Sequence, residues 1–194
     1  EGYNLVLTGS NAKLFSKELA TALTGRHIPI QILPFDFNEI LRAKGYKFSP
    51  DKLLVPEEKA KFLEYLNEYM INGGYPEVVI KNLDPRDYLD VLFDSLLFKD
   101  VVKRHKIRFS EQIDWLGLYL INNIAGQYSI RKLTNILDFK SDITLERYLS
   151  YLTEAYLIFS LYRYSTKVNL RLKSPKKTYV VDNGFVTARA VRHS

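Results

Sequence analysis

The spacing of hydrophobic and polar positions divides the chain into a short N-terminal segment with strand character and a longer remainder with helical character. Two apolar runs, 3–8 and 28–33, flank a helical pattern over 14–24 that ends at Gly25. Strand–helix–strand order is typical of a parallel sheet. Because a parallel sheet needs cover on both faces, the pattern predicts that residues 1–35 are one part of a larger α/β domain.

Residues 36–110 have helical spacing throughout. The pattern predicts three helices, over 37–43, from Pro56 to Gly73-Gly74, and from Asp84-Pro85 towards His105. Proline at the first helical position and glycine after the last one favour these limits. The apolar stripe of the middle helix comprises Leu63, Leu66 and Met70. Because the apolar faces of these helices need cover, we expect the segment to pack on the module that follows it.

Residues 111–181 have the pattern of three helices followed by two strands. The first helix has an apolar stripe ending at Ile124, Ser129 can cap the second, and Ser141 or Asp142 can cap the third,. The strands are expected at 158–164 and 178–181, around a basic connection. This order is that of a winged helix-turn-helix. The predicted fold class is therefore mostly α with minor β (α+β).

Charge is distributed unevenly along the chain. Residues 160–194 hold eight Lys and Arg against Asp182 alone, a net charge of +7, whereas 1–159 sum to −1. A positive cluster attracts phosphate polymers, although a solvated, lysine-rich loop gives the same pattern. The chain has no cysteine, which excludes disulfides and fits a cytoplasmic protein. It also has no apolar run long enough for a transmembrane helix,.

The winged helix-turn-helix predicts contacts with double-stranded DNA. On the third helix Thr144, Arg147 and Tyr151 lie opposite the apolar stripe, where side chains meet a major groove,. Glu154 on the same face opposes this, because a carboxylate repels phosphate. The expected phosphate contacts are Arg131, Lys132 and Lys140, with Arg163, Lys167, Arg171, Lys173, Lys176 and Lys177 along the wing,. The alternative is a winged helix that docks another protein.

The chain by itself shows no catalytic constellation. It contains no G-x-x-x-x-G-K-[ST] phosphate-binding loop, and its three histidines lack metal-ligand spacing,. We expect no metal site, no tight ATP binding and no ATP hydrolysis from this chain alone.

Four stretches give the chain a family resemblance. They are Leu5–Ser10, Leu23–Arg26 with Leu33–Phe37, Gly73-Gly74-Tyr75-Pro76, and Lys177–Gly184. In this order they resemble the prokaryotic AAA-type (AAA+/STAND-like) ATPases that carry a winged helix and a C-terminal nuclease-like domain of uncertain function. The resemblance implies a fragment that lacks the Walker A and Walker B segments.

The resemblance also implies a domain division and a set of partners. Residues 1–35 would end a nucleotide-binding domain, 36–110 would form a helical lid, 111–181 the winged helix, and 182–194 would begin a further domain. The parent protein would use ATP and Mg²⁺. Its partners would be the missing ATPase segment, the C-terminal domain, duplex DNA and possible further copies of the chain in a homo-oligomer, with no membrane contact.

The resemblance implies roles for two groups of polar residues in the N-terminal segment, one after the first apolar run and one after the helix expected over 14–24. Thr8, Ser10 and Asn11 match a sensor that hydrogen-bonds the γ-phosphate or the attacking water, at the carboxyl end of a parallel strand. The alternative is a turn with Ser10 as a cap. Arg26 would reach a nucleotide phosphate, and the alternative is an arginine that complements the dipole of the preceding helix.

Gly73, Gly74 and Pro76 match the lid turn of the family, which packs near adenine. Glycine permits close approach and proline gives a rigid wall. A glycine cap followed by a turn explains the same residues. The resulting prediction is a C-terminal piece of an ATPase that couples ATP to DNA binding. The rival predictions are a winged-helix DNA-binding regulator and a protein-docking module, both without ATPase activity.

Overall fold

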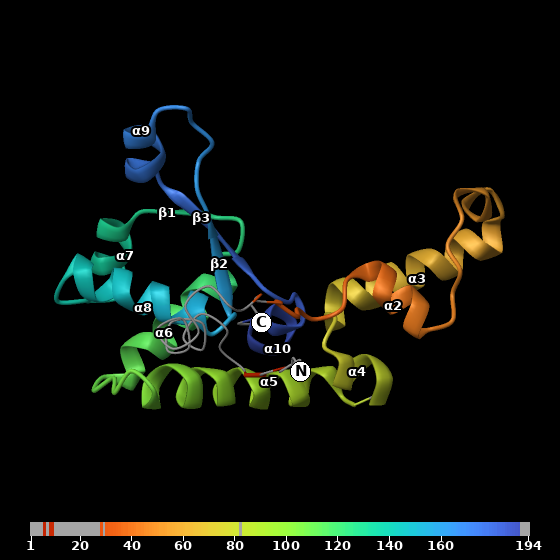
Figure 1. The fold of residues 1–194 in the computed structure, drawn as a ribbon, viewed down its shortest axis with the longest axis horizontal. Coiled ribbons are helices and arrows are strands. Elements are labelled where there is room, and N and C mark those ends of the chain that lie inside the picture. Colours follow the sequence, from red (N-terminus) through yellow and green to blue (C-terminus); the bar gives the residue numbers. More distant parts are fainter. Residues whose placement is uncertain (1–5, 7, 10–27, 29, 82, 191–194) are drawn as a thin grey trace, which may run out of the picture.

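The computed structural model describes residues 6, 8–9, 28, 30–81 and 83–190. Figure 1 shows two parts that lie side by side along the long axis. The arm, residues 35–72, contains α2 (Phe37–Ala43), η1 (Pro50–Leu54) and α3 (Pro56–Asn72). The body, residues 85–190, contains the remaining helices and the sheet. Helix α4 (Pro76–Lys81) follows the arm in sequence and packs against α2, at the end of the arm that meets the body.

The body combines seven helical segments with one small sheet in the described residues. Its elements are α5 (Pro85–Ser95), the π-helix η2 (Leu96–Lys103), α6 (Ser110–Asn122), β1 (Gln127–Tyr128), α7 (Ile130–Ile136), α8 (Asp142–Glu154), β2 (Ile158–Leu161), α9 (Val168–Lys173), β3 (Lys176–Val180) and α10 (Gly184–Arg189). The three strands are antiparallel in the order β1-β3-β2. The expected α+β class, mostly helical with minor β, is confirmed.

Local capping signals explain where the helices of residues 111–181 begin. The Ser129 side chain accepts from the Lys132 backbone N–H before α7, and Ser141 does the same for Thr144 before α8,. Helix α6 ends at Asn122, so Ile124 is exposed rather than part of its inward stripe. The basic connection between β2 and β3 contains α9, which the sequence pattern did not predict.

The core of the body is aliphatic and continuous. Helices α5 and η2 follow one another without a break and bury Leu89, Phe93, Leu97 and Val101, which are spaced four residues apart. Inward side chains of α6, α8 and the sheet complete the cluster. As expected, the helix that starts at Pro85 packs on the module that follows it.

The arm buries Ile40 and Leu41 of α2, and most of its other contacts are made by aromatic rings. Phe62 lies 5.3 Å from Phe37 and 5.2 Å from Phe48, and Tyr65 lies 5.7 Å from Tyr46, between ring centroids. The predicted apolar stripe of α3 is wrong as its packed face, because Leu63 and Met70 are exposed and α3 buries no residue fully. The aromatic positions of α3 lie on a neighbouring face and take the contacts with α2 and its loop.

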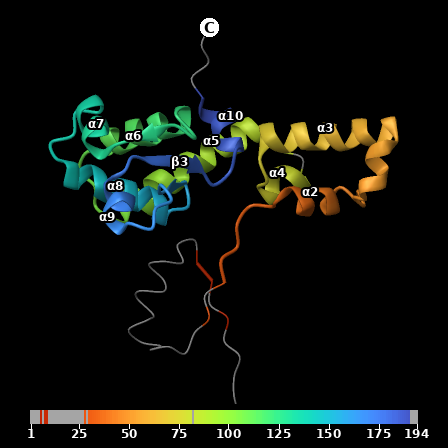
Figure 2. The same ribbon diagram turned by 90° about the horizontal axis from the view of Figure 1, so that it is seen from above.

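The predicted strand over 28–33 is also wrong for the residues that the structure describes there. Residues 28 and 30–33 carry no strand, and the side chains of Ile28, Ile30 and Ile32 are at least 80% exposed. A parallel strand requires hydrogen-bonded neighbours, and no described strand lies beside this run. Figure 2 shows residues 30–35, in orange, leading away from the sheet. The predicted strand at 3–8 and helix at 14–24 fall almost entirely outside the described residues.

Candidate nucleic-acid interface

Helix α8 presents a different outward face from the one that the sequence pattern predicts. Arg147 is exposed, beside Glu146 and Ile143. Thr144 is half-buried at the first turn, where its hydroxyl lies 3.0 Å from the Ser141 hydroxyl. Its cap interaction ties Thr144 to the start of the helix, so Arg147 is the most open of the predicted groove residues.

Tyr151 does not point into solvent as predicted. Its ring stacks on His105, with 3.5 Å between centroids and 10° between planes. Glu154, one turn further on, has its Oε2 4.0 Å from His105 Nε2. The end of η2 therefore covers this side of α8, because Tyr151 and Glu154 share a face and η2 packs against it. The larger exposed side chains of α8, Ile143, Glu146 and Arg147, therefore lie in its first half.

The contact between η2 and α8 partly buries the His105 side chain. Burial lowers the pKa of His105, while Glu154 acts in the opposite direction and Arg104 adds to the lowering. The buried Nε2 has no hydrogen-bond partner in the described part of the chain. Neutral His105 therefore fits this contact better than the imidazolium does.

The expected phosphate contacts around α7 are exposed. Arg131 and Lys132 lie on α7 with open side chains, and Lys140 precedes α8 with its Nζ 5.8 Å from the centroid of the Phe109 ring. They and Arg147 are brought onto one module, since α7 and α8 pack directly on each other. Glu146 and Asp142 are exposed on α8 as well, so its open face is not uniformly basic.

The β2–β3 hairpin carries the other predicted cations. Figure 1 shows α9 at its tip, projecting from the body. Arg163, Lys167, Arg171 and Lys173 are exposed, whereas Lys176 and Lys177 on β3 are half-buried. The Tyr162 ring lies under two of these cations, 4.7 Å from Lys176 Nζ and 5.9 Å from the Arg171 guanidinium carbon. These contacts place Lys176 of β3 and Arg171 of α9 beside Tyr162, and both Arg171 and Lys173 of α9 remain exposed.

The glycines predicted to border adenine lie at the joint between arm and body. The Gly74 backbone N–H donates to Asp182 Oδ2 at 2.7 Å, and the Gly184 N–H donates to Asp182 Oδ1 at 2.8 Å. The Phe35 N–H donates to the Gly74 carbonyl at 2.8 Å. A Cβ at Gly73 would overlap the Asp182 carboxylate, and one at Gly74 would overlap the Phe35 carbonyl. The close approach at these glycines is thus made by the chain itself.

Asp182 is the residue that sequence reasoning missed. It is buried two residues after the end of β3, and burial raises the pKa of its carboxyl, while the two N–H donors act in the opposite direction. An aspartate followed two residues later by glycine, at the end of a strand, is the local signal of an Asx-turn. That signal predicts the Gly184 contact but not the one with Gly74, which is 108 positions away in sequence.

The other predicted nucleotide residues are placed only in part. Pro76 starts α4 and is half-buried, and Thr8 is exposed. Ser10, Asn11 and Arg26 lie outside the described residues. The nucleotide roles of all these residues stay predictions.

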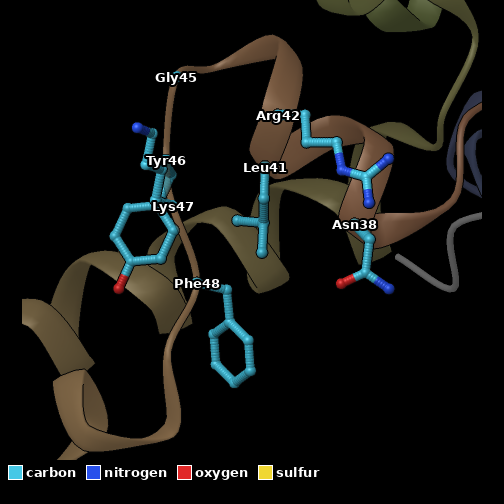
Figure 3. A pocket seen from close by; sticks show the side chains of 7 residues that line it. All are labelled: Asn38, Leu41, Arg42, Gly45, Tyr46, Lys47 and Phe48. Carbon is cyan, nitrogen blue, oxygen red and sulfur yellow. The ribbon is translucent and has the colours of Figure 1, made fainter.

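A hollow of about 500 Å³ lies in the arm, at the end of α2 (Figure 3). It is lined by Asn38, Leu41, Arg42, Gly45, Tyr46, Lys47 and Phe48. None of the predicted site residues lines it. Among the described residues there is also no group of three or more acidic or histidine side chains arranged to hold a metal ion, and no helix long and apolar enough to cross a bilayer.

Comparison with known protein families places most of the chain. Residues 63–192 match the family described as a domain of unknown function, DUF8612. The chain belongs to this family. Residues 1–41 match a second family, described as an AAA domain. The DUF8612 segment holds Gly74, Asp182 and every predicted DNA contact, whereas Phe35 belongs to the AAA-matching segment. The joint therefore connects the two matched segments.

Two curated relatives align with nearly the whole chain. An uncharacterized protein of Methanocaldococcus jannaschii, MJ1544, is 40% identical over 188 residues, which is 93% of this chain and 42% of that protein. An uncharacterized protein of Haemophilus influenzae is 31% identical over 188 residues, 94% of this chain and 44% of that protein. The chain spans less than half the length of both relatives. No solved structure matches it.

Proposed function

We propose that this chain is the DNA-binding part of an AAA-type ATPase, with residues 111–181 acting as a winged helix-turn-helix on double-stranded DNA. The observation that carries the proposal is the order α6–β1–α7–α8–β2–β3 together with a hairpin whose exposed cations form no ion pair with the acids of the described residues. Three helices followed by a strand pair is the arrangement that places a helix in the major groove and a hairpin on the adjacent backbone.

The electrostatics of the hairpin support a phosphate ligand. Residues 160–190 contain no acid besides Asp182, and that carboxylate is buried against two backbone N–H groups. Arg189 is also removed from the count of free cations, because it pairs with Asp90 and Asp94 on α5. The remaining exposed cations lie on the hairpin, where an uncompensated charge attracts a polyanion.

ATP chemistry is proposed only for the full-length protein. The AAA match over residues 1–41 supports that origin. This chain has no phosphate-binding loop in its sequence, and the space at Gly73 and Gly74 is filled by its own side chain and backbone. The residues present therefore do not fit a nucleotide by themselves, and we assign no ATP- or Mg²⁺-dependent step to them.

The proposal is tested by fluorescence anisotropy with a labelled duplex at two salt concentrations. Lys167→Ala with Lys173→Ala removes two exposed hairpin cations, and each lost phosphate contact should flatten the slope of log K against log[salt] by about 0.9. Lys59→Ala with Lys81→Ala makes the same charge change on α3 and α4 and should leave the slope unchanged. Absence of salt-sensitive duplex binding by the wild-type chain would favour the protein-docking alternative.

Arg147 provides a separate test of groove binding. As the most open of the predicted groove residues on α8, it is the candidate for a base edge, where a bidentate contact contributes about 1–3 kcal/mol of discrimination,. Arg147→Ala should weaken binding to a preferred sequence more than binding to random duplex. Equal losses on both would mean that the protein contacts DNA without sequence readout by this helix.

A further inference from the structure

The two faces of the three-stranded sheet differ sharply in what they contact. Side chains of Ile158, Thr178 and Val180 point into the core and are buried, and Ser160 beside them hydrogen-bonds the Tyr128 hydroxyl at 2.8 Å. Because side chains alternate along a strand, Phe159, Leu161, Lys177 and Tyr179 all lie on the opposite, outer face.

The outer face is unusually apolar for a surface open to solvent. In the sheet register Phe159 is opposite Tyr179, and Leu161 is opposite Lys177. The Phe159 and Tyr179 rings are stacked, with 5.5 Å between centroids and 17° between planes. The side chains of Phe159 and Leu161 remain 45% and 53% exposed. An antiparallel sheet with one solvated face normally fills that face with polar residues, so this face has the chemistry of a binding surface.

The positive charge of the hairpin that carries this face favours an anionic ligand. From Phe159 to Tyr179 the sequence contains six Lys and Arg and no acid. Lys177 lies on the outer face itself, Lys176 precedes it on β3, and the other four lie in the connection between β2 and β3. A partner must therefore be anionic and at the same time offer flat apolar surfaces to the two rings. Unpaired nucleotides combine these properties, because phosphates meet the cations while bases stack on aromatic side chains. The bases of an intact duplex are already stacked on one another and present only their edges.

We propose that the outer face of the sheet, centred on Phe159, Tyr179 and Lys177, binds unpaired nucleotides, so that the substrate class is duplex DNA with a single-stranded extension. This inference rests on the proposed function and extends it. The open half of α8 meets the duplex, while the sheet face takes the strand that leaves it.

The test compares a blunt duplex, the same duplex with an oligothymidylate tail, and the tail alone, by fluorescence anisotropy at low salt. For the wild-type chain, the tail should raise the affinity of the duplex. Phe159→Leu with Tyr179→Leu keeps apolar side chains on the sheet but removes the rings, and should lower the affinity for the tailed duplex about tenfold, in line with the loss of base stacking. The blunt-duplex affinity should not change. Trp115→Leu removes an exposed aromatic ring from α6 and is the matched control.

A second measurement does not depend on the folding of the variant. Photo-crosslinking of wild-type chain to a tail containing 5-iododeoxyuridine should label peptides that contain Phe159 or Tyr179. The inference is overturned if the tail adds no affinity, if the double variant folds and binds the tailed duplex as the wild type does, or if the crosslinks fall elsewhere. Salt-sensitive binding of the blunt duplex would then still support the proposed function. If the wild-type chain binds none of these DNAs, both this inference and the proposed function are overturned.

Discussion

The arm and the body are both mainly helical, yet they are stabilised in different ways. In the body, Leu97, Leu116 and Leu145 are completely buried in one continuous cluster. In the arm, α3 runs for 17 residues without a fully buried side chain and is held to α2 mainly by ring contacts. Since stability follows apolar area removed from water, the body should fold as the stable unit. The arm should open locally at a lower free energy.

The joint at Gly74 and Asp182 marks the boundary between the arm and the more stable body. Helix α10 packs on α3 where arm and body meet, and the hydrogen bonds of Asp182 with Gly74 and of Gly74 with Phe35 lie at the same place. Asp182 lies two residues after the end of β3, one of the hairpin strands. A displacement of the AAA-matching segment at Phe35 therefore has a short physical route to the hairpin.

The largest expected effect is in the body core. Phe185 on α10 is fully buried, with ring centroids 5.4 Å from Tyr75 and 5.6 Å from Phe93. Phe185→Ala should lower the free energy of unfolding by about 3–5 kcal/mol, because it leaves a cavity. Urea denaturation followed by circular dichroism measures this. Val91→Ala on exposed α5 surface is the control, and a similar loss in both variants would contradict a core centred here.

A smaller effect is expected at the joint. Asp182→Ala leaves the buried N–H groups of Gly74 and Gly184 without an acceptor, which should cost about 2–4 kcal/mol in total. Hydrogen exchange should also become faster at Gly74 than at core positions of α6. Asn183→Ala, at an exposed neighbour whose side chain caps nothing, should be close to neutral. Unchanged protection at Gly74 would show that the joint does not depend on this carboxylate.

The smallest effect is expected in the arm. Phe62→Ala removes the ring that contacts Phe37, Tyr46 and Phe48, and should cost about 1–2 kcal/mol,. The loss should be local, with faster hydrogen exchange over 50–72 and no change over 111–157. The adjacent Leu63→Ala should leave exchange unchanged, because Leu63 is exposed. Faster exchange throughout the body would mean that arm and body unfold together.

Elements with strong local signals were predictable from the sequence. Proline starts α3 and α5, Asp36 and Asp84 cap α2 and α5, and serine caps α7 and α8. These signals act over a few residues, so the limits of the helices predicted between residues 36 and 181 agree with the structure to within a turn, and η2 falls inside the helix predicted to run towards His105. The short segments η1, α4 and α9 were not predicted. The predicted helix over 37–43 is α2 itself.

The sites depended on contacts between distant segments, and these were not predictable. The pattern placed Tyr151 opposite the apolar stripe of α8, but it could not show that η2 covers that side. It also left the packed face of α3 undetermined, because leucine and aromatic positions compete for it and the partner rings lie on α2 and its loop. Asp182 and Gly74 meet only through the tertiary fold.

The π-helix η2 determines which way the side chains of this long helical segment face. Buried residues recur at intervals of four, at Leu89, Phe93, Leu97 and Val101, and the same interval leads to the half-buried His105. In a regular α-helix each step of four residues advances by about 40° around the axis, so such a seam would rotate out of contact over its length. The wider turn of a π-helix rotates less per residue and reverses this drift. Because of this smaller rotation, one line of side chains stays directed at the core, and His105 at its end lies against the ring of Tyr151.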